Sequence, residues 1–500
     1  MKLRLLLGFA SLSVSALHAA DTPPATPASS APAPAAANAP APGATTTAAI
    51  SAPATVEGYS YVKSLGGISE YTLDTNGLQV LVRPDHSAPV VTFMVTYRVG
   101  SRNEGLGVTG ATHLLEHLMF KGTENFNRAK GNSIDQLLER VGAEYNATTW
   151  LDRTNYFANL GKDHLEAYVA IEADRMRNLW LRDSDRRPEM TVVRNEFEIG
   201  ENNPIQALDK EISSAAYIAH PYHHPTIGWR SDIENVSIEK LREFYDTFYW
   251  PDNATVTVIG DIAPADALAL VKKYYGAIPK TPHPIPQVYT VEPAQSGPRR
   301  VIVKRSGQLG VVGIAFKTPA ARHADMPALQ VLGSILSSGK NSRLYRALTD
   351  KNLTTSVSTD IGFFHDPSLT TVYASLAPGA KHEDVEKIAL AELERVKKDG
   401  VTAQEVSSAI SQLVASSAYA RDGAFAIAST LNEYISGGDW TLYVTLDGAI
   451  KQVTAADIKR VAETYLDETQ STTGWFIPIL PPEGVQLPPP GPGGSGPISR

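Results

Sequence analysis

The chain has 500 residues, 43% of them hydrophobic and 20% charged, which predicts a globular protein of more than one domain. Its formal net charge is −8, and an acidic surface argues against nucleic acid as a partner, because phosphate binding requires a basic patch. The absence of cysteine excludes disulfides, thiolate metal ligands and a cysteine nucleophile, so a metal site must use imidazole and carboxylate.

The first twenty residues are typical of a signal peptide. Lys2 and Arg4 precede a short apolar stretch that ends in small residues near Ala20. The stretch is shorter than a bilayer-spanning segment, and no later run reaches that length, so no membrane span is expected once residues 1–20 are removed. An uncleaved membrane anchor is the alternative. We expect a periplasmic or secreted bacterial protein, with a Gram-negative host as the first choice.

Low-complexity segments bracket the body of the chain. Residues 21–56 are almost all Ala, Pro, Thr and Ser and cannot bury enough apolar surface to offset their ordering entropy. We therefore expect a disordered tether there. The tail, residues 481–500, is rich in Pro and Gly and is also unsuited to packing. Patterned sequence lies between them.

The body contains a weak internal repeat. Residues 237–256 show a helical pattern, a turn and a β-rich run, and residues 454–477 repeat this order. Near the start of each half, a β-rich run (residues 90–99 and residues 311–316) precedes a loop and a helix. The pattern predicts an α+β fold of two homologous domains, each with helices packed on a largely antiparallel sheet.

The domain boundaries are expected around a proline-rich linker. We place the first domain, which carries the candidate metal site, at residues 57–282 and the linker at residues 283–298. The second domain, without a metal site, is expected at residues 299–480.

The sharpest motif lies in the segment GATHLLEHLMFKG, residues 110–122. His113 and His117 are four residues apart, so on a helix their Cβ atoms lie roughly 5–6 Å apart on one face. Both imidazoles can then reach one Zn²⁺ at about 2.0–2.1 Å. Glu116 lies beside His117, near the open side of such a site, and is the candidate general base. A surface helix with two solvated histidines is the alternative.

A catalytic zinc usually has three protein ligands and a water, so a third ligand is required. The segment 188–199 has helical spacing and opens with a proline, which suits a helix start. Glu189 and Glu196 are seven residues apart and share a face of that helix. We assign Glu196 as the ligand and Glu189 as a carboxylate that orients the site. Glu198 and Glu201 are expected to be solvated.

With these residues the sequence resembles the insulinase/pitrilysin-like zinc peptidases, the inverzincins, which include the mitochondrial processing peptidases. The H-x-x-E-H order is theirs, and the resemblance covers most of residues 60–480. It implies one Zn²⁺ per chain and matches Glu189 and Glu196 to the family's acidic pair, of which the second is the ligand. The separation of 79 residues between His117 and Glu196 is slightly long and implies a small insertion.

The resemblance also implies a substrate-binding strand at Asn146 and Ala147. In the family the asparagine contacts the substrate backbone, and the strand edge pairs with an extended peptide, which is β-augmentation. For Asn146 the alternative is an ordinary polar residue at a strand end.

One segment departs from the family. Members carry an arginine and a tyrosine, in a stretch like L-R-x-K-x-G-L-x-Y, that hydrogen-bond the substrate and stabilise the tetrahedral intermediate. Here residues 348–357 are one residue shorter, with Thr349 in place of the arginine and Thr355 in place of the tyrosine. Losing such a donor typically costs on the order of 10²–10³ in rate.

The family's chamber consists of four such domains, and this chain is expected to have two. The resemblance therefore implies a homologous second subunit that supplies the arginine and tyrosine, in a heterodimer whose zinc-bearing subunit is this chain. A homodimer is the rival arrangement.

The expected activity is zinc-dependent endopeptidase cleavage of short or unfolded peptides. Alternatives are a non-proteolytic peptide-binding or assembly component and a peptidase that processes one specific precursor, for example in cofactor maturation. A structural-zinc protein is disfavoured because it needs a fourth ligand, for which the formal candidates are His164, His223 and His224.

Overall fold

The computed structural model describes residues 55–479, which belong to one compact unit. The predicted signal peptide, nearly all of the predicted tether and the predicted tail lie outside the described residues. Within residues 55–479, no helix is both long and apolar enough to cross a bilayer.

The first half is built on a mixed but mainly antiparallel sheet, in the order β1-β2-β3-β7-β4-β6-β5. Only β3 and β7 run parallel among the described pairs of this sheet. The strands are β1 (Tyr59–Leu65), β2 (Ile68–Leu73), β3 (Gln79–Pro84), β4 (Val90–Tyr97), β5 (Glu144–Thr149), β6 (Thr154–Gly161) and β7 (Ala254–Gly260). The central strands β4 and β7 are buried almost throughout, as expected for strands covered on both faces.

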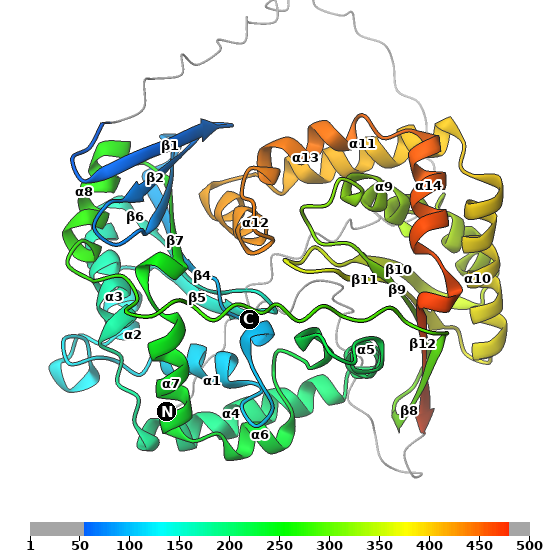
Figure 1. Cartoon of the computed structure of the whole chain (residues 1–500), viewed down its shortest axis with the longest axis horizontal. Helices are drawn as coiled ribbons and strands as arrows, with labels where there is room; N and C mark the ends of the chain where they lie inside the picture. The colour runs from blue at the N-terminus through cyan, green and yellow to red at the C-terminus, as the bar shows by residue number, and fades with distance from the viewer. Residues whose placement is uncertain (1–54, 480–500) are drawn as a thin grey trace, which may run out of the picture. The chain divides into compact units, whose positions relative to one another are not determined.

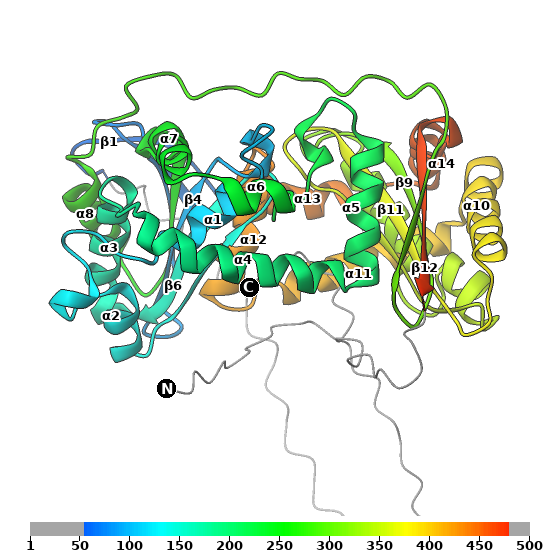
Figure 2. The same ribbon diagram turned by 90° about the horizontal axis from the view of Figure 1, so that it is seen from below.

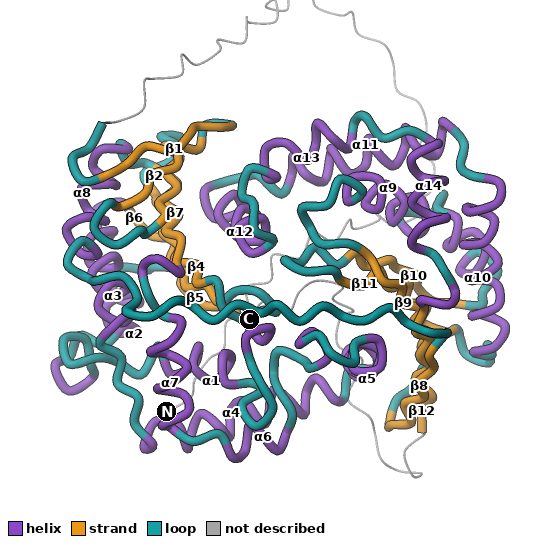
Figure 3. Tube along the Cα trace, in the orientation of Figure 1, coloured by secondary structure: helices purple, strands orange, loops and turns teal. Residues whose placement is uncertain are grey.

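The second half repeats this topology with a sheet in the order β10-β11-β9-β12-β8. Its strands are β8 (Arg299–Ser306), β9 (Val311–Thr318), β10 (Thr354–Ile361), β11 (Ser368–Leu376) and β12 (Ser471–Ile479). β8 and β12 are parallel and the other pairs are antiparallel. Taken in the order β8, β12, β9, β11 and β10, these strands correspond to β3, β7, β4, β6 and β5 of the first sheet. The predicted α+β fold of two homologous halves is confirmed (Figure 3).

Helices flank the strands in both halves. The first half has α1 (Ala111–Leu118), α2 (Ile134–Arg140), α3 (Leu165–Arg177), α4 (Asp183–Glu201), α5 (Pro204–Ala216), α6 (Arg230–Asn235), α7 (Ile238–Phe248) and α8 (Pro264–Tyr275). The second has α9 (Met326–Ser337), α10 (His382–Asp399), α11 (Ala403–Tyr419), α12 (Ala424–Ser436), α13 (Leu442–Ile450) and α14 (Ala455–Tyr465). The two predicted repeat segments are α7 followed by β7 and α14 followed by β12.

Each half contributes one helix to the sheet of the other (Figure 1). On α5, Leu208 and Ile212 are fully buried and pack with Phe476 of β12. On α12, Leu431 and its neighbours pack with Phe157 of β6. Fully burying such a side chain contributes about 1.5–3 kcal/mol, so each half depends on the other for a covered sheet face.

The predicted start of α4 is wrong. The helix begins at Asp183, and Pro188 lies inside it rather than at its first turn. Asp183 stabilises the earlier start, because its carboxylate lies at the positive end of the helix dipole and pairs with Arg186 and Arg187.

The segment between the two sheets lacks a helix or strand from residue 276 to residue 298 of the described chain, as a linker should. It is nevertheless anchored, because Glu292 accepts hydrogen bonds from the backbone N–H groups of residues 218–220. The exact domain boundaries remain predictions.

Candidate metal centre

The start of α1 is fixed by two features of its backbone. Gly110 has a φ of 83°, and a Cβ there would lie 2.4 Å from the carbonyl oxygen of Ile227. Glu104 accepts hydrogen bonds from the N–H groups of Gly110 (2.8 Å) and Thr112 (2.7 Å). Its carboxyl group therefore caps the N-terminus of α1. Burial raises the pKa of Glu104 to about 8 despite these hydrogen bonds, so the cap carries little negative charge near neutral pH.

The other end of α1 meets a buried cation. Arg175 is 1% exposed, pairs with Glu172 and donates to the carbonyl oxygen of Met119. Its guanidinium also lies over the ring of Tyr156, 4.3 Å from the centroid. The hydrogen-bonded cap at one end and the cation at the other, which complements the helix dipole, hold α1 in place.

Three side chains converge on one point. His113 and His117 lie on the same face of α1, and α4 brings Glu196 to them. One carboxylate oxygen of Glu196 lies 3.6 Å from the Nε2 atom of each histidine. Ligand atoms on a tetrahedral zinc lie roughly 3.4 Å apart, given bonds of about 2.0–2.1 Å. Two imidazoles and a carboxylate at this spacing fit a zinc ion and leave one coordination position free.

Glu189 contacts the ring nitrogen of His117 that does not face Glu196. It accepts a hydrogen bond from Nδ1 of His117 at 3.0 Å, which leaves Nε2 facing Glu196, and it pairs with Lys121. Burial alone would lower the pKa of His117, but the carboxylates of Glu189 and Glu196 outweigh it and raise that pKa to about 10. The centre therefore strongly favours positive charge, and a divalent cation would compete with the proton for the same position.

Glu116 is buried beside the three candidate ligands, with 8% of its surface exposed. The hydroxyl of Thr149 on β5 donates a hydrogen bond to its carboxylate. Burial raises the pKa of Glu116 to about 7, against the opposing effects of Thr149 and His117. A carboxylate with a pKa near neutrality is suited to take up and release a proton.

The predicted substrate strand is β5, the last strand of its sheet. Within the described residues it pairs only with β6, so its other edge is open to an extended peptide. Asn146 is exposed, and its side-chain oxygen accepts a hydrogen bond from the N–H of Ala147, whose side chain is buried.

The other predicted residues lie apart from this centre. Among residues 55–479, the metal-ligand group that includes α1 has three members and contains none of His164, His223 and His224. Thr349 and Thr355 lie in the second half: Thr349 contacts Thr354, and Thr355 is exposed on β10.

Glu198 and Glu201 were both expected to be solvated, and only one of them is. Glu198 is exposed, but Glu201 is half-buried and pairs with Lys210 and Arg305, because α4 ends against the second half.

No sequence pattern singles out Glu104 or Thr149, although Glu104 fixes the start of α1 and Thr149 contacts Glu116. Strand alternation places Thr149 on the same face as Ala147, which is the one available signal. The capping role of Glu104 depends on a loop conformation that periodicity cannot reveal.

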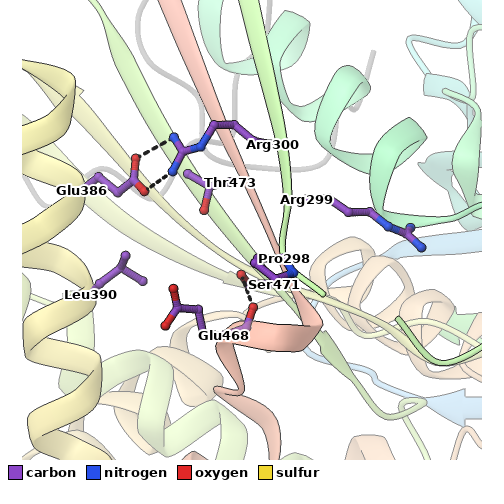
Figure 4. Close-up of a pocket in the computed structure, with 8 residues that line it drawn as sticks. All are labelled: Pro298, Arg299, Arg300, Glu386, Leu390, Glu468, Ser471 and Thr473. Carbon is purple, nitrogen blue, oxygen red and sulfur yellow. Dashed lines mark hydrogen bonds and ion pairs between the residues drawn. The ribbon is translucent and has the colours of Figure 1, made fainter. Parts of the chain in front are cut away.

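A separate pocket of about 140 Å³ lies in the second half (Figure 4). Its wall includes Arg300, which forms two hydrogen bonds with Glu386, and Glu386 also accepts one from Trp475. The charges are paired with each other, and none of the lining residues comes from α1, α4 or β5. We assign this cluster to the packing of α10 on the second sheet.

Comparison with known proteins gives matches along most of the chain. The family model described as insulinase, peptidase family M16, matches residues 79–229, and the one described as the peptidase M16 inactive domain matches residues 235–413. The candidate ligands and Glu116 all lie in the first match.

Among curated proteins, the zinc protease PqqE of Helicobacter pylori is 32% identical over 408 residues, which cover 81% of this chain and 91% of that protein. A probable mitochondrial-processing peptidase subunit beta of Arabidopsis thaliana is 24% identical and covers 81% and 77%.

Among solved structures, a protease from Helicobacter pylori is 32% identical with a TM-score of 0.79, covering 83% of this chain and all of that one. The first half of the periplasmic protease PqqL from Escherichia coli shares the fold alone. It is 19% identical, covers 84% and 93% of the two chains, and has a TM-score of 0.68.

Proposed function

The chain belongs to the insulinase family of peptidases, family M16, and we propose that it is a zinc-dependent endopeptidase that cleaves short or unfolded peptides. One observation carries the proposal: a buried glutamate, Glu116, lies beside a three-ligand metal group and contacts β5, an edge strand, through Thr149. Base, metal group and peptide-binding edge are the parts that hydrolysis of a peptide bond requires.

His113, His117 and Glu196 would hold the ion, and Glu189 would orient His117. When bound, Zn²⁺ supplies Lewis acidity, which acidifies water and polarises a peptide carbonyl. Glu116 takes the proton from the attacking water and later delivers it to the nitrogen of the leaving amine. Thr149 supports the first of these roles, because its hydroxyl favours the ionised carboxylate.

The peptide would lie along β5 as an added strand. Such pairing uses backbone hydrogen bonds, so it selects extended segments more strongly than particular side chains. Asn146 and Ala147 would contact the backbone near the scissile bond. Folded proteins would be poor substrates because their strands are already paired.

A homologous second subunit is part of the proposal. Thr349 and Thr355 offer neither a guanidinium nor a phenol, so the arginine and tyrosine would come from another two-domain chain. A homodimer is the alternative assembly. Residues 1–20 would direct export to the periplasm or the medium and would then be removed.

The two threonines also favour a second candidate, a peptide-binding component that does not cleave. A quenched fluorescent peptide library separates the two candidates, with the zinc-loaded chain assayed alone and with proteins that co-purify from its source. The proposal predicts cleavage that a chelator abolishes and Zn²⁺ restores, and no cleavage by Glu116→Gln with zinc still bound. Peptide binding without cleavage in either preparation would favour the second candidate. Cleavage restricted to one natural precursor would identify a processing peptidase.

A further inference from the structure

A buried arginine connects the proposed peptide-binding strand to the second half of the chain. Arg153 immediately precedes β6 and is 5% exposed. One of its guanidinium nitrogens donates to the hydroxyl of Thr148 (2.6 Å) and to the side-chain oxygen of Asn155 (2.7 Å). The other pairs with Glu433 of α12. A single planar group thus joins β5, β6 and a helix of the second half.

Asn155 on β6 is a second connection to α12. Its side-chain oxygen accepts hydrogen bonds from Thr148 (2.6 Å) and from the amide of Asn432 (3.1 Å), in addition to Arg153. Asn432 in turn accepts a hydrogen bond from Thr96 of β4 at 2.7 Å. Asn155 and Asn432 are both 2% exposed, so water cannot replace these bonds.

These contacts act on the face of β5 opposite to Glu116. Side chains alternate along a strand, so Thr148 points to one face and Thr149 to the other. Thr149 bonds Glu116 on the metal side, and Thr148 bonds Arg153 and Asn155 on the α12 side. An edge strand has a partner on one side only, so side-chain anchors of this kind restrict its position.

We propose that Glu433 and Asn432 of α12 are positioning residues for peptide binding, acting through Arg153 and Asn155 to hold β5 in place. The inference rests on the proposed function, in which β5 receives the peptide. It gives the second domain, which has no metal ligand in the group described above, a role at the active site.

The effect is expected on binding rather than on folding. The side chain of Glu433 is 39% exposed but that of Arg153 is only 6% exposed, so the test uses Glu433→Gln, which keeps an oxygen acceptor for the buried guanidinium. Apolar contacts of α12 with the first sheet do not involve Glu433 and would keep the helix docked. Loss of the ion pair would leave the guanidinium of Arg153 with its bonds to Thr148 and Asn155 only, which loosens the link between β5 and α12.

The chain offers a matched control at the opposite side of the same sheet. Glu70 on β2 is buried and accepts a hydrogen bond at 2.7 Å from Trp440, which lies between α12 and α13. β2 and β5 lie near opposite edges of the sheet. Like Glu433→Gln, Glu70→Gln removes one negative charge from a contact between the two halves of the chain. Unlike Glu433, whose partner Arg153 bonds Thr148 of β5, Glu70 lies on a strand near the opposite edge of the sheet.

The experiment measures peptide affinity without turnover. In the zinc-loaded Glu116→Gln protein, the Kd of a fluorescent peptide that the parent enzyme cleaves is determined by anisotropy, with Glu433→Gln, Arg153→Lys or Glu70→Gln added. We expect roughly a fivefold to tenfold weaker Kd for the first two, within the range for losing one hydrogen bond, and no change for Glu70→Gln. In the Glu116 background the same two variants should raise KM more than they lower kcat.

Two outcomes contradict the inference in different ways. Unchanged affinity in both Glu433→Gln and Arg153→Lys, or equal weakening by Glu70→Gln, overturns the positioning role and leaves the proposed function intact. Failure of the parent protein to bind or cleave any peptide overturns the proposed function and this inference together.

Discussion

Replacement of Glu189 by alanine tests whether this residue orients the metal centre without itself binding the metal. The variant removes the acceptor for Nδ1 of His117 and leaves Lys121 without its carboxylate partner. The imidazole can then rotate or change tautomer, so Nε2 no longer faces Glu196.

The structure sets the size of the effect. The side chain of Glu189 is 12% exposed and makes one charge-assisted hydrogen bond of 3.0 Å to His117. Loss of such a partner typically weakens metal binding about 10–100-fold, or roughly 1.4–2.7 kcal/mol. Glu189→Gln keeps an acceptor in place and should lie at the lower end. Glu196→Ala removes a ligand and should reduce zinc occupancy far more.

Competition against a chromophoric chelator measures the zinc Kd for each variant. Glu198→Ala is the matched control, because Glu198 lies on the same helix and its side chain is 52% exposed. Wild-type zinc affinity in Glu189→Ala, or equal weakening by Glu198→Ala, would refute the orienting role.

Three further predictions concern the surroundings of the centre. Thr149→Val removes a hydrogen bond that lowers the pKa of Glu116, so that pKa should rise. The acid limb of the pH profile of kcat/KM should then move to higher pH, and an unmoved limb would show that Thr149 does not act on Glu116. Glu104→Ala leaves two N–H groups at the start of α1 without an acceptor and should lower the free energy of unfolding by about 1–3 kcal/mol, measured by urea titration, whereas an unchanged midpoint argues against the cap. Residues 57–282 and 299–480, expressed separately, should show no cooperative unfolding transition, because α5 and α12 lose the sheets they cover; two sharp transitions would contradict this interdependence.

The sequence predicted the parts of the site that depend on local spacing. Histidines four positions apart and glutamates seven positions apart each lie on one helix face, and both pairs are on helices, α1 and α4. The repeated order of helix, turn and strand likewise predicted two similar halves.

Features set by tertiary contacts were not predictable from these patterns. An amphipathic helix shows that one face is buried but not by which sheet, so nothing indicated that α5 and α12 cross to the other half. Arg153 and Glu433 are far apart in sequence and carry no spacing signal. The start of α4 was misplaced because Pro188 suits the first turn of a helix, whereas the helix in fact begins at Asp183.

Anomalous diffraction at the zinc edge, on crystals of the Glu116→Gln protein with zinc, tests the central claim most directly. The account predicts one peak per chain at about 2.0–2.1 Å from Nε2 of His113, Nε2 of His117 and a carboxylate oxygen of Glu196. A protein that takes up no zinc, or a peak bound elsewhere with Glu196 turned away from the histidines, would contradict it.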